Sequence, residues 1–377
     1  MVSASTTYRS LTRSEPGREA ITEPYRFFGS LRLLLAAMVL TQHLHWIAPG
    51  TVGQQLGSYS TGDIGVLTFF VLSGFVISEA ADLFYQARPV AFLSNRLLRI
   101  VPPFLFAFAI CVFCSYVLVS TGTFKVIEVP QIASETNSMF SPRNLAANVL
   151  YLIPGMDKLF GTPTFFFIPI TWAIRTEMAF YFTVFAALVA SGHRLRLEVI
   201  LFILAIVQIA LYALWLVEGF PHMARYGFYF GLGASLYYAT AGRRAAWILS
   251  AIFFGGMLYD FSIYAVPSGT NRLAMPQAVA QYALFIACTG AIAVLPRLRG
   301  SIAARKVDSA LGDLSYPFYL NRVAVIVTVY SLIDTPSVGA MAAASIIVLL
   351  VSIAAHMAVE PVLVPLRNRL RGRALLS

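Results

Sequence analysis

The sequence predicts an all-α membrane protein: a polytopic helical bundle with about ten transmembrane helices and both termini in the cytoplasm. Of the 377 residues, 58% are hydrophobic and only 12% are charged, and the mean hydropathy is +0.75. A soluble globular protein carries about 25% charged residues. Apolar runs of about 20 residues recur along the chain, and this length crosses the hydrocarbon core of a bilayer. Basic residues gather at alternate ends of these runs, as the positive-inside rule predicts.

The predicted membrane domain covers residues 28–363, between a polar N-terminal cytoplasmic tail (1–27) and a basic C-terminal cytoplasmic tail (364–377). The N-terminal tail is too long and too charged to resemble a cleavable signal peptide. The ten predicted spans are 29–48, 64–81, 101–120, 170–191, 197–217, 223–241, 245–264, 275–296, 312–333 and 338–359.

The distribution of basic residues sets the predicted orientation. With the N-terminus inside, nineteen Lys and Arg residues fall on the cytoplasmic side and four fall outside. The opposite orientation would invert this ratio. The net charge of +10 therefore encodes topology, and nucleic acid is not an expected partner.

The longest predicted connection, 121–169, lies on the outer side and contains the apolar pieces Leu145–Pro154 and Thr164–Ile170. A connection this long is usually functional or has structure of its own. A re-entrant segment, a surface helix and an eleventh membrane element are all compatible with it. The chain shows no internal repeat, which disfavours a transporter built from inverted halves.

The first span carries two ionisable residues, Arg32 and His43, separated by ten residues. Eleven helical steps turn through about 1100°, roughly 20° past three full turns, and rise about 16 Å. The two side chains therefore share one face, and both are costly in a bilayer. Such a face can hold an anion at one end and act chemically at the other. A buried structural histidine and a snorkelling arginine are the alternatives, and His45 is a secondary candidate.

The second span and the segment after it contain two further candidate features. Ser73 and Gly74 lie in mid-span, where a small residue allows either another helix or a slender ligand to approach closely. Arg96 and Arg99 are three residues apart and share a helix face at the cytoplasmic interface. A pair of guanidinium groups suits a phosphate-rich ligand, although topogenic charge explains the same spacing. Pro102 and Pro103 mark the start of the third span.

Charged residues also fall within or beside later spans. Arg175 and Glu177 at the start of the fourth span each need a partner or a wet cavity. Arg322 in the ninth span needs a counter-charge, and Pro317 kinks that helix or fixes its first turn. At the end of the tenth span, Glu360 is expected to form an ion pair with the basic tail.

The cysteines give no evidence of a redox or metal site. Cys111, Cys114 and Cys288 all lie in apolar stretches. The pair Cys111 and Cys114 lacks both a thioredoxin-like context and further metal ligands, which favours simple packing. We therefore expect no metal site.

Several segments together resemble the acyltransferase type 3 family of integral membrane acyltransferases, which includes bacterial surface-polysaccharide O-acetylases and some macrolide acylases. The resemblance runs from about Tyr25 to Arg367. It is carried, in order, by Arg32 with His43, Gly65–Ile77, Arg96–Pro102, Trp172 with Glu177, Phe180 and Tyr181, Leu311–Leu320, and Glu360 with Pro361.

The resemblance implies transfer of an acyl group, by default acetyl, from cytoplasmic acyl-CoA to a hydroxyl of a carbohydrate or glycolipid. His43 takes the position of the essential histidine. It would act as general base or form an acyl-histidine, with Glu177 orienting the imidazole or holding the acceptor. The expected donor-binding residues are Arg32, Arg96, Arg99, Ser73 and Gly74. The expected substrate-binding residues are Trp172, Tyr181, Tyr316 and Arg322.

Two positions depart from the family pattern: Leu67 stands where aspartate is common, and Arg322 stands where histidine is common. The expected location is the plasma (inner) membrane, among membrane lipids, with acyl-CoA as co-substrate and no permanently bound cofactor. The sequence does not determine the oligomeric state. The competing hypotheses are a transporter or flippase that uses buried charges as a path, an acylase of a small molecule such as a macrolide, and a sensor that has lost catalysis.

Overall fold

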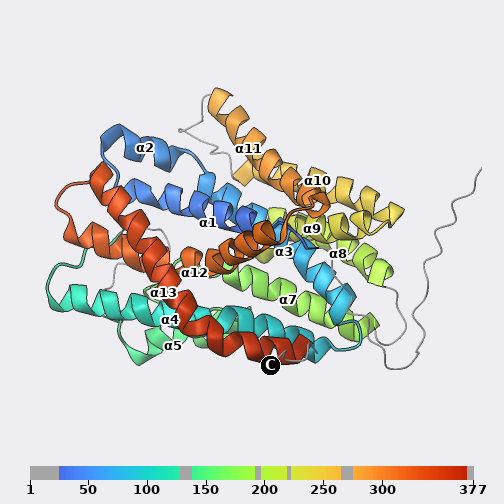
Figure 1. The fold of residues 1–377 in the computed structure, drawn as a ribbon, viewed down its shortest axis with the longest axis horizontal. Helices are drawn as coiled ribbons and strands as arrows, with labels where there is room; N and C mark the ends of the chain where they lie inside the picture. Colours follow the sequence, from blue (N-terminus) through green and yellow to red (C-terminus); the bar gives the residue numbers. More distant parts are fainter. Residues whose placement is uncertain (1–24, 128–137, 192–196, 219–221, 265–274, 372–377) are drawn as a thin grey trace, which may run out of the picture.

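The computed structural model describes residues 25–127, 138–191, 197–218, 222–264 and 275–371, and within these ranges the regular elements are all helices (Figure 1). In chain order they are α1 (Gly29–His43), η1 (Leu44–Trp46), α2 (Gly50–Ser58), α3 (Thr61–Phe84), α4 (Pro89–Ser120), α5 (Pro142–Leu150), α6 (Met156–Phe160), α7 (Thr171–Ser191), α8 (Leu197–Glu218), η3 (His222–Tyr226), α9 (Gly227–Thr240), α10 (Arg244–Tyr264), α11 (Met275–Val294), η4 (Leu295–Arg297), α12 (Ile302–Leu332) and α13 (Val338–Arg371).

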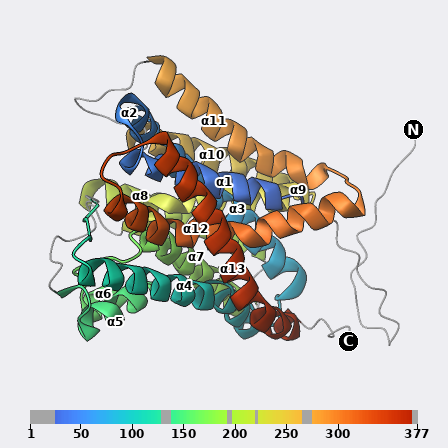
Figure 2. The same ribbon diagram turned by 60° about the vertical axis from the view of Figure 1, so that its left-hand side comes forward.

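The long helices run side by side as a bundle, with α3 and α12 in its interior (Figures 1 and 2). Helix α3 packs against α1, α7, α9 and α11, and α12 packs against α1, α4 and α13. Figure 2 shows the short helices α5 and α6 at one end of the bundle, away from the end of α13. Helices α1, α3 and α12 therefore bring residues from distant parts of the sequence together.

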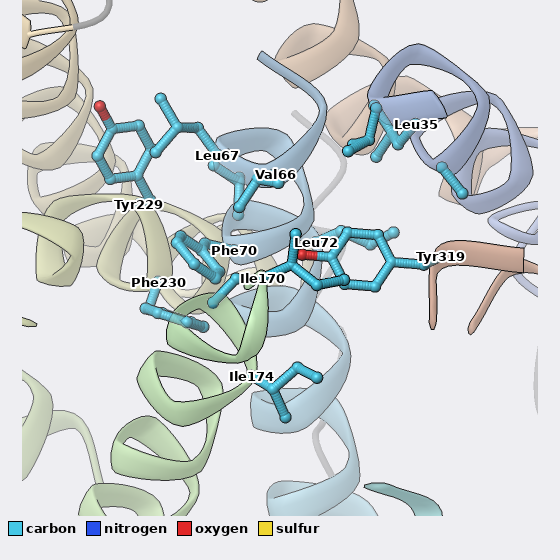
Figure 3. Packing of buried hydrophobic residues seen from close by; sticks show 14 of the residues in the cluster. Leu35, Val66, Leu67, Phe70, Leu72, Ile170, Ile174, Tyr229, Phe230 and Tyr319 are labelled. Atoms are coloured by element: carbon cyan, nitrogen blue, oxygen red, sulfur yellow. The ribbon is translucent and has the colours of Figure 1, made fainter. Parts of the chain in front are cut away.

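The core around α3 is apolar and rich in aromatic rings (Figure 3). Phe70 stacks on Phe230 of α9 with ring centroids 4.8 Å apart. The backbones of α3 and α9 touch at two glycines, because a Cβ at Gly74 would overlap the Phe230 carbonyl and one at Gly233 would overlap the Val71 carbonyl. Such close crossings of small residues hold membrane helices together through van der Waals packing.

A carboxylate from α12 caps the start of α1. Asp308 accepts hydrogen bonds from the backbone N–H groups of Gly29 (2.9 Å) and Ser30 (2.7 Å), from Ser30 Oγ (2.6 Å) and from the hydroxyl of Tyr25 (2.9 Å). Burial opposes ionisation of this carboxyl, but the hydrogen bonds outweigh it and lower the pKa of Asp308. Because free N–H groups at a helix start need acceptors, Asp308 fixes the end of α1 that carries Arg32.

Six stretches of the described residues are long and apolar enough to cross a membrane, and they include α3, α4, α7, α10, α11 and α13. The chain is therefore an all-helical protein with several membrane-spanning candidates. Each of the ten predicted spans coincides with a helix in whole or in part. A count of about ten spans and the placement of both termini in the cytoplasm stay predictions.

Several predicted boundaries were wrong. Helix α4 begins at Pro89, so Pro102 and Pro103 lie inside it rather than at its start, and α12 likewise runs through Pro317. Helix α13 continues through Pro361 and Pro365 to Arg371, into the predicted tail. Proline is tolerated inside membrane helices because neighbouring groups satisfy the backbone atoms that it frees.

The first span is also interrupted. Helix α1 ends at His43, a 3₁₀ turn follows, and the helix α2 was not expected at all. Of the long connection, residues 128–137 lie outside the described residues. The described part contains α5 and α6, whose nine and five residues are too short to cross a bilayer. Asn144 and Asn148 of α5 tie it to the backbone of Phe165.

Candidate functional site

Five helices form a narrow pocket at the level of the predicted arginines, which we call the inner pocket. It has a volume of about 100 Å³ and is lined by Arg32 of α1, by Val66, Phe69, Phe70, Leu72, Ser73, Val76 and Ile77 of α3, by Arg96, Arg99 and Ile100 of α4, by Ala173, Ile174, Glu177 and Tyr181 of α7, and by Ser315, Tyr316 and Tyr319 of α12. The structure thus brings together seven of the predicted site residues: Arg32, Ser73, Arg96, Arg99, Glu177, Tyr181 and Tyr316.

The arginines of the inner pocket come from two helices. Arg96 is buried at 3% exposure, and its guanidinium lies 5.6 Å from the centroid of the Phe92 ring. Arg32 and Arg99 are half-buried. The three positive charges converge on one apolar-walled space, in which electrostatic attraction is less screened than in water.

Glu177 is held in the inner pocket by two hydroxyl groups. Ser73 Oγ donates to Glu177 Oε1 at 2.9 Å, and Tyr181 Oη donates to the same oxygen at 2.7 Å. Ser73 and Tyr181 come from α3 and α7, so Glu177 links these helices. Its negative charge lies in a pocket with Arg32, Arg96 and Arg99, and it partly balances them.

A wider and more polar space, which we call the vestibule, adjoins the inner pocket. Its volume is about 980 Å³, and it shares Val76, Arg96 and Arg99 with the inner pocket. Its other basic residues are Arg26, Arg297 and Arg305. Arg26 pairs with Glu79 at 2.9 Å. The vestibule lies at the helix ends that the basic residues predict to be cytoplasmic.

His43 faces a different space, which we call the histidine pocket. This small pocket, of about 30 Å³, is lined by His43, Trp46, Ile127, Pro169, Ile170, Arg322, Val323, Ile326 and Val327. His43 Nδ1 lies 2.7 Å from the carbonyl oxygen of Val39. A carbonyl only accepts, so Nδ1 carries a proton and Nε2 of the neutral ring is left as the basic atom. The volume has room for about two water molecules.

Tyr319 of α12 lines the inner pocket and contacts Arg322, which lines the histidine pocket. Its ring lines the inner pocket, opposite Leu72 of α3 (Figure 3), and contacts Phe69 with centroids 6.2 Å apart. The guanidinium of Arg322, which lines the histidine pocket, lies 4.2 Å from the centroid of the same ring. Tyr319 therefore contacts a side chain of each pocket.

Some predicted residues take other positions. At Gly74 the close neighbour is the backbone of α9, and Gly74 does not line the inner pocket. Trp172 packs against Phe70 and Tyr226, at 6.3 and 5.4 Å between ring centroids. Glu177 lines the inner pocket, whereas His43 faces the Val39 carbonyl, and the expected role of Glu177 in orienting the imidazole or holding the acceptor stays a prediction.

Two charges that needed partners have them. Arg175 pairs with Asp157 of α6, and its guanidinium lies 4.5 Å from the centroid of the Tyr151 ring. Glu360 pairs with Arg367, as the sequence predicted. His45 turns toward the carbonyl oxygen of Gln42, with Nδ1 2.6 Å from it, and does not line the histidine pocket.

Sequence reasoning missed Tyr319, Asp308 and the vestibule arginines. Tyr319 lies three residues before Arg322, a spacing that places both on one helix face and that could have pointed to it. Arg26, Arg297 and Arg305 were counted only as topogenic charges. Asp308 gave no signal, because its partners lie about 280 residues away in the chain.

These features define an integral membrane protein with an arginine-lined pocket and, further along α1, a separate small pocket at a histidine. The acyltransferase 3 family model, described as an acyltransferase domain, matches residues 25–357. The chain belongs to this family, which implies membrane acyltransferase activity. No curated protein and no solved structure matches the chain.

Proposed function

We propose that the protein transfers an acetyl group from cytoplasmic acetyl-CoA to a hydroxyl group of a carbohydrate, such as a surface polysaccharide or lipid-linked glycan, at the plasma membrane. The single observation that carries this proposal is the sequence of spaces along the bundle: a wide arginine-lined vestibule, a narrow pocket with Arg32, Arg96 and Arg99, and a small pocket at His43. CoA has the matching shape, since it carries phosphates at one end and a thioester at the tip of a slim arm.

The phosphate groups of CoA bind in the vestibule and at its junction with the inner pocket. Arg96 and Arg99 line both spaces, and guanidinium groups bind phosphate oxygens through two parallel hydrogen bonds. The pantetheine arm runs along the inner pocket past Tyr319. The rise of about 16 Å from Arg32 to His43 along α1 is comparable with the length of this arm.

His43 acts as general base at the tip of the arm. Nε2 accepts the proton of the acceptor hydroxyl while the hydroxyl oxygen attacks the thioester carbon. The tetrahedral intermediate then collapses, the carbon–sulfur bond breaks, and the CoA thiolate takes the proton from the imidazolium. The products are the acetyl ester and free CoA. The acyl-histidine route differs in that Nε2 itself attacks the thioester first.

The size of the histidine pocket supports acetyl as the acyl group. Its volume of about 30 Å³ and its walls of Val323, Ile326 and Val327 leave little room beyond a methyl group. The acceptor reaches this end of the bundle from the predicted outer side, where η1 and α2 follow His43.

The test uses membranes that contain the protein, incubated with acetyl-CoA labelled in the acetyl group, beside membranes with the His43→Ala protein at equal abundance. Label in a glycan fraction, released by mild base, is expected only with the wild-type protein. Mass spectrometry of surface glycans from a deletion strain identifies the acceptor by the loss of acetyl groups. Movement of an unmodified substrate across the membrane, without label transfer, would instead establish the transporter hypothesis.

A further inference from the structure

Arg322 is a buried cation without a counter-charge among the described residues. It is 0% exposed, and no described carboxylate lies within ion-pair distance of it. Burying a charge without a partner is costly unless its hydrogen bonds are satisfied. Arg322 is such a charge, and it lies inside the membrane domain. Ionisable residues at such positions usually have a function, so a functional role is the first hypothesis.

Two of the three guanidinium nitrogen atoms of Arg322 make no hydrogen bond within the described part of the chain. One terminal nitrogen, Nη1, donates to the carbonyl oxygen of Tyr319, one turn earlier in α12. Nε and Nη2 are buried and have no partner in the described part of the chain. The plane of the guanidinium is supported by the Tyr319 ring, 4.2 Å from its centroid. The group is thus held in place from one side and has unsatisfied donors.

Arg322 shares the histidine pocket with His43, and the remaining walls are apolar. A full anionic sugar does not fit a volume of about 30 Å³. A single carbonyl group with a methyl substituent does. The ligand chemistry that suits this pocket is therefore a small carbonyl whose oxygen becomes negative during the reaction.

We propose that Arg322 is a catalytic residue that binds the oxyanion of the tetrahedral intermediate when His43 activates the acceptor hydroxyl. This inference rests on the proposed function. As the hydroxyl oxygen bonds to the thioester carbon, the π electrons of the carbonyl move to its oxygen. Nε–H and Nη2–H of Arg322 donate to that oxygen. When the carbon–sulfur bond breaks, the electron pair returns to form the ester carbonyl and the thiolate leaves.

The energetic argument is that Arg322 gains a counter-charge only in the transition state. The thioester carbonyl of bound acetyl-CoA is neutral, so it relieves little of the burial cost. The oxyanion relieves it fully, and donors that are already oriented do so without reorganisation. Interactions that are stronger in the transition state than in the bound substrate are the ones that accelerate a reaction.

The decisive experiment measures binding and needs no acceptor. Two nonreactive CoA thioethers of equal shape replace the acetyl thioester: carboxymethyl-CoA, which ends in a carboxylate, and carboxamidomethyl-CoA, which ends in a neutral amide. The purified wild-type protein is expected to bind the carboxylate at least about tenfold more tightly, because hydrogen bonds between two charged groups are stronger than those to a neutral amide. Arg322→Met is expected to lose this preference and Arg322→Lys to keep part of it.

Val325→Ala is the matched control, because Val325 is buried in the same helix but does not line the histidine pocket. It should keep the preference of the wild-type protein. A preference that persists in Arg322→Met, or one that Val325→Ala also abolishes, would overturn the assignment. If the wild-type protein binds neither thioether nor acetyl-CoA, the proposed function itself is wrong.

A kinetic measurement gives a second readout. In Arg322→Met, kcat for acetyl transfer should fall about 10²- to 10³-fold, the usual effect of removing an oxyanion donor. The KM for acetyl-CoA should change less than threefold, because Arg322 contributes little to the binding of the neutral thioester. A rise in KM with unchanged kcat would make Arg322 a donor-binding residue and would contradict the proposal.

Discussion

The two ends of the path through the bundle differ in almost every physical property. The vestibule is wide, about 980 Å³, and several arginines line it, whereas the histidine pocket is about 30 Å³ and mostly apolar. Arg26 in the vestibule has an ion-pair partner, while Arg322 in the histidine pocket has none among the described residues. A wide cationic space suits the binding of a charged ligand, and a narrow dry one suits chemistry at a single atom.

This difference divides the expected mutational effects into two kinds. Changes in the vestibule and inner pocket should act on donor affinity, and changes in the histidine pocket should act on turnover. Tyr319 of the inner pocket contacts Arg322 of the histidine pocket, so the two regions meet at this pair. Three predictions test this division and a fourth tests the support of α1, in order of decreasing effect on turnover.

The largest effect is expected for His43→Ala. Loss of a general base typically lowers kcat by about 10²- to 10⁴-fold, while the Kd for acetyl-CoA should stay near that of the wild-type protein. Label transfer and equilibrium binding measure the two quantities separately. His45→Ala is the control, because this neighbouring histidine does not line the pocket. Wild-type turnover in His43→Ala would remove His43 from the mechanism.

The next effect concerns the arginines shared by the vestibule and the inner pocket. The double change Arg96→Ala and Arg99→Ala should raise the Kd for acetyl-CoA by at least about 100-fold, since each hydrogen bond between charged groups contributes about 1.5–3 kcal/mol. Isothermal titration of the purified protein measures it. Arg244→Ala removes an exposed arginine that lines neither space and should leave the Kd unchanged. An unaltered Kd in the double variant would contradict phosphate binding here.

A smaller effect is expected on the choice of acyl group. Ile326→Ala enlarges the histidine pocket, so kcat/KM for propionyl-CoA relative to acetyl-CoA should rise about tenfold, the usual scale for one methylene in an apolar pocket. Competition between the two donors in one reaction, followed by mass spectrometry of the product, measures the ratio. The same ratio in wild-type and variant proteins would show that the acyl group binds elsewhere.

The smallest effect on turnover is expected at Asp308, whose role is to hold α1. Asp308→Ala leaves Gly29 and Ser30 N–H groups without their acceptor and should lower the free energy of unfolding by about 1–3 kcal/mol at pH 7. Because the folded-state pKa of Asp308 is lowered, this contribution is present above the unfolded-state pKa. It is lost as the pH falls through the folded-state value.

Thermal unfolding in detergent at a series of pH values measures this contribution. The difference in Tm between the wild-type protein and Asp308→Ala should shrink as the pH decreases. Asp313→Ala is a suitable control, because Asp313 is exposed on the same helix. A Tm difference that is independent of pH would show that the carboxylate charge is not what stabilises the start of α1.

Much of the architecture followed from sequence alone. The helical class, the helix positions, the ion pair of Glu360 with Arg367 and the family all follow from apolar run length, charge distribution and motif order. The interruption after His43 did not, because an apolar run does not show where a helix ends. The extension of α4 and α12 through proline did not either, since proline at a span boundary and proline inside a packed membrane helix look alike in sequence.

The sequence by itself determined which residues of the site are present and that Arg32 and His43 share a helix face, because helical periodicity is a local property. Only the tertiary structure decided that Arg32, Arg96, Arg99 and Glu177 meet in one pocket while His43 and Arg322 meet in another. It also placed the Tyr319 ring of the inner pocket against Arg322, and Asp308 at the start of α1. The physical reason is that crossings such as Gly74 and Gly233 on α3 and α9 fix which helix faces meet, and these contacts join residues far apart in the chain.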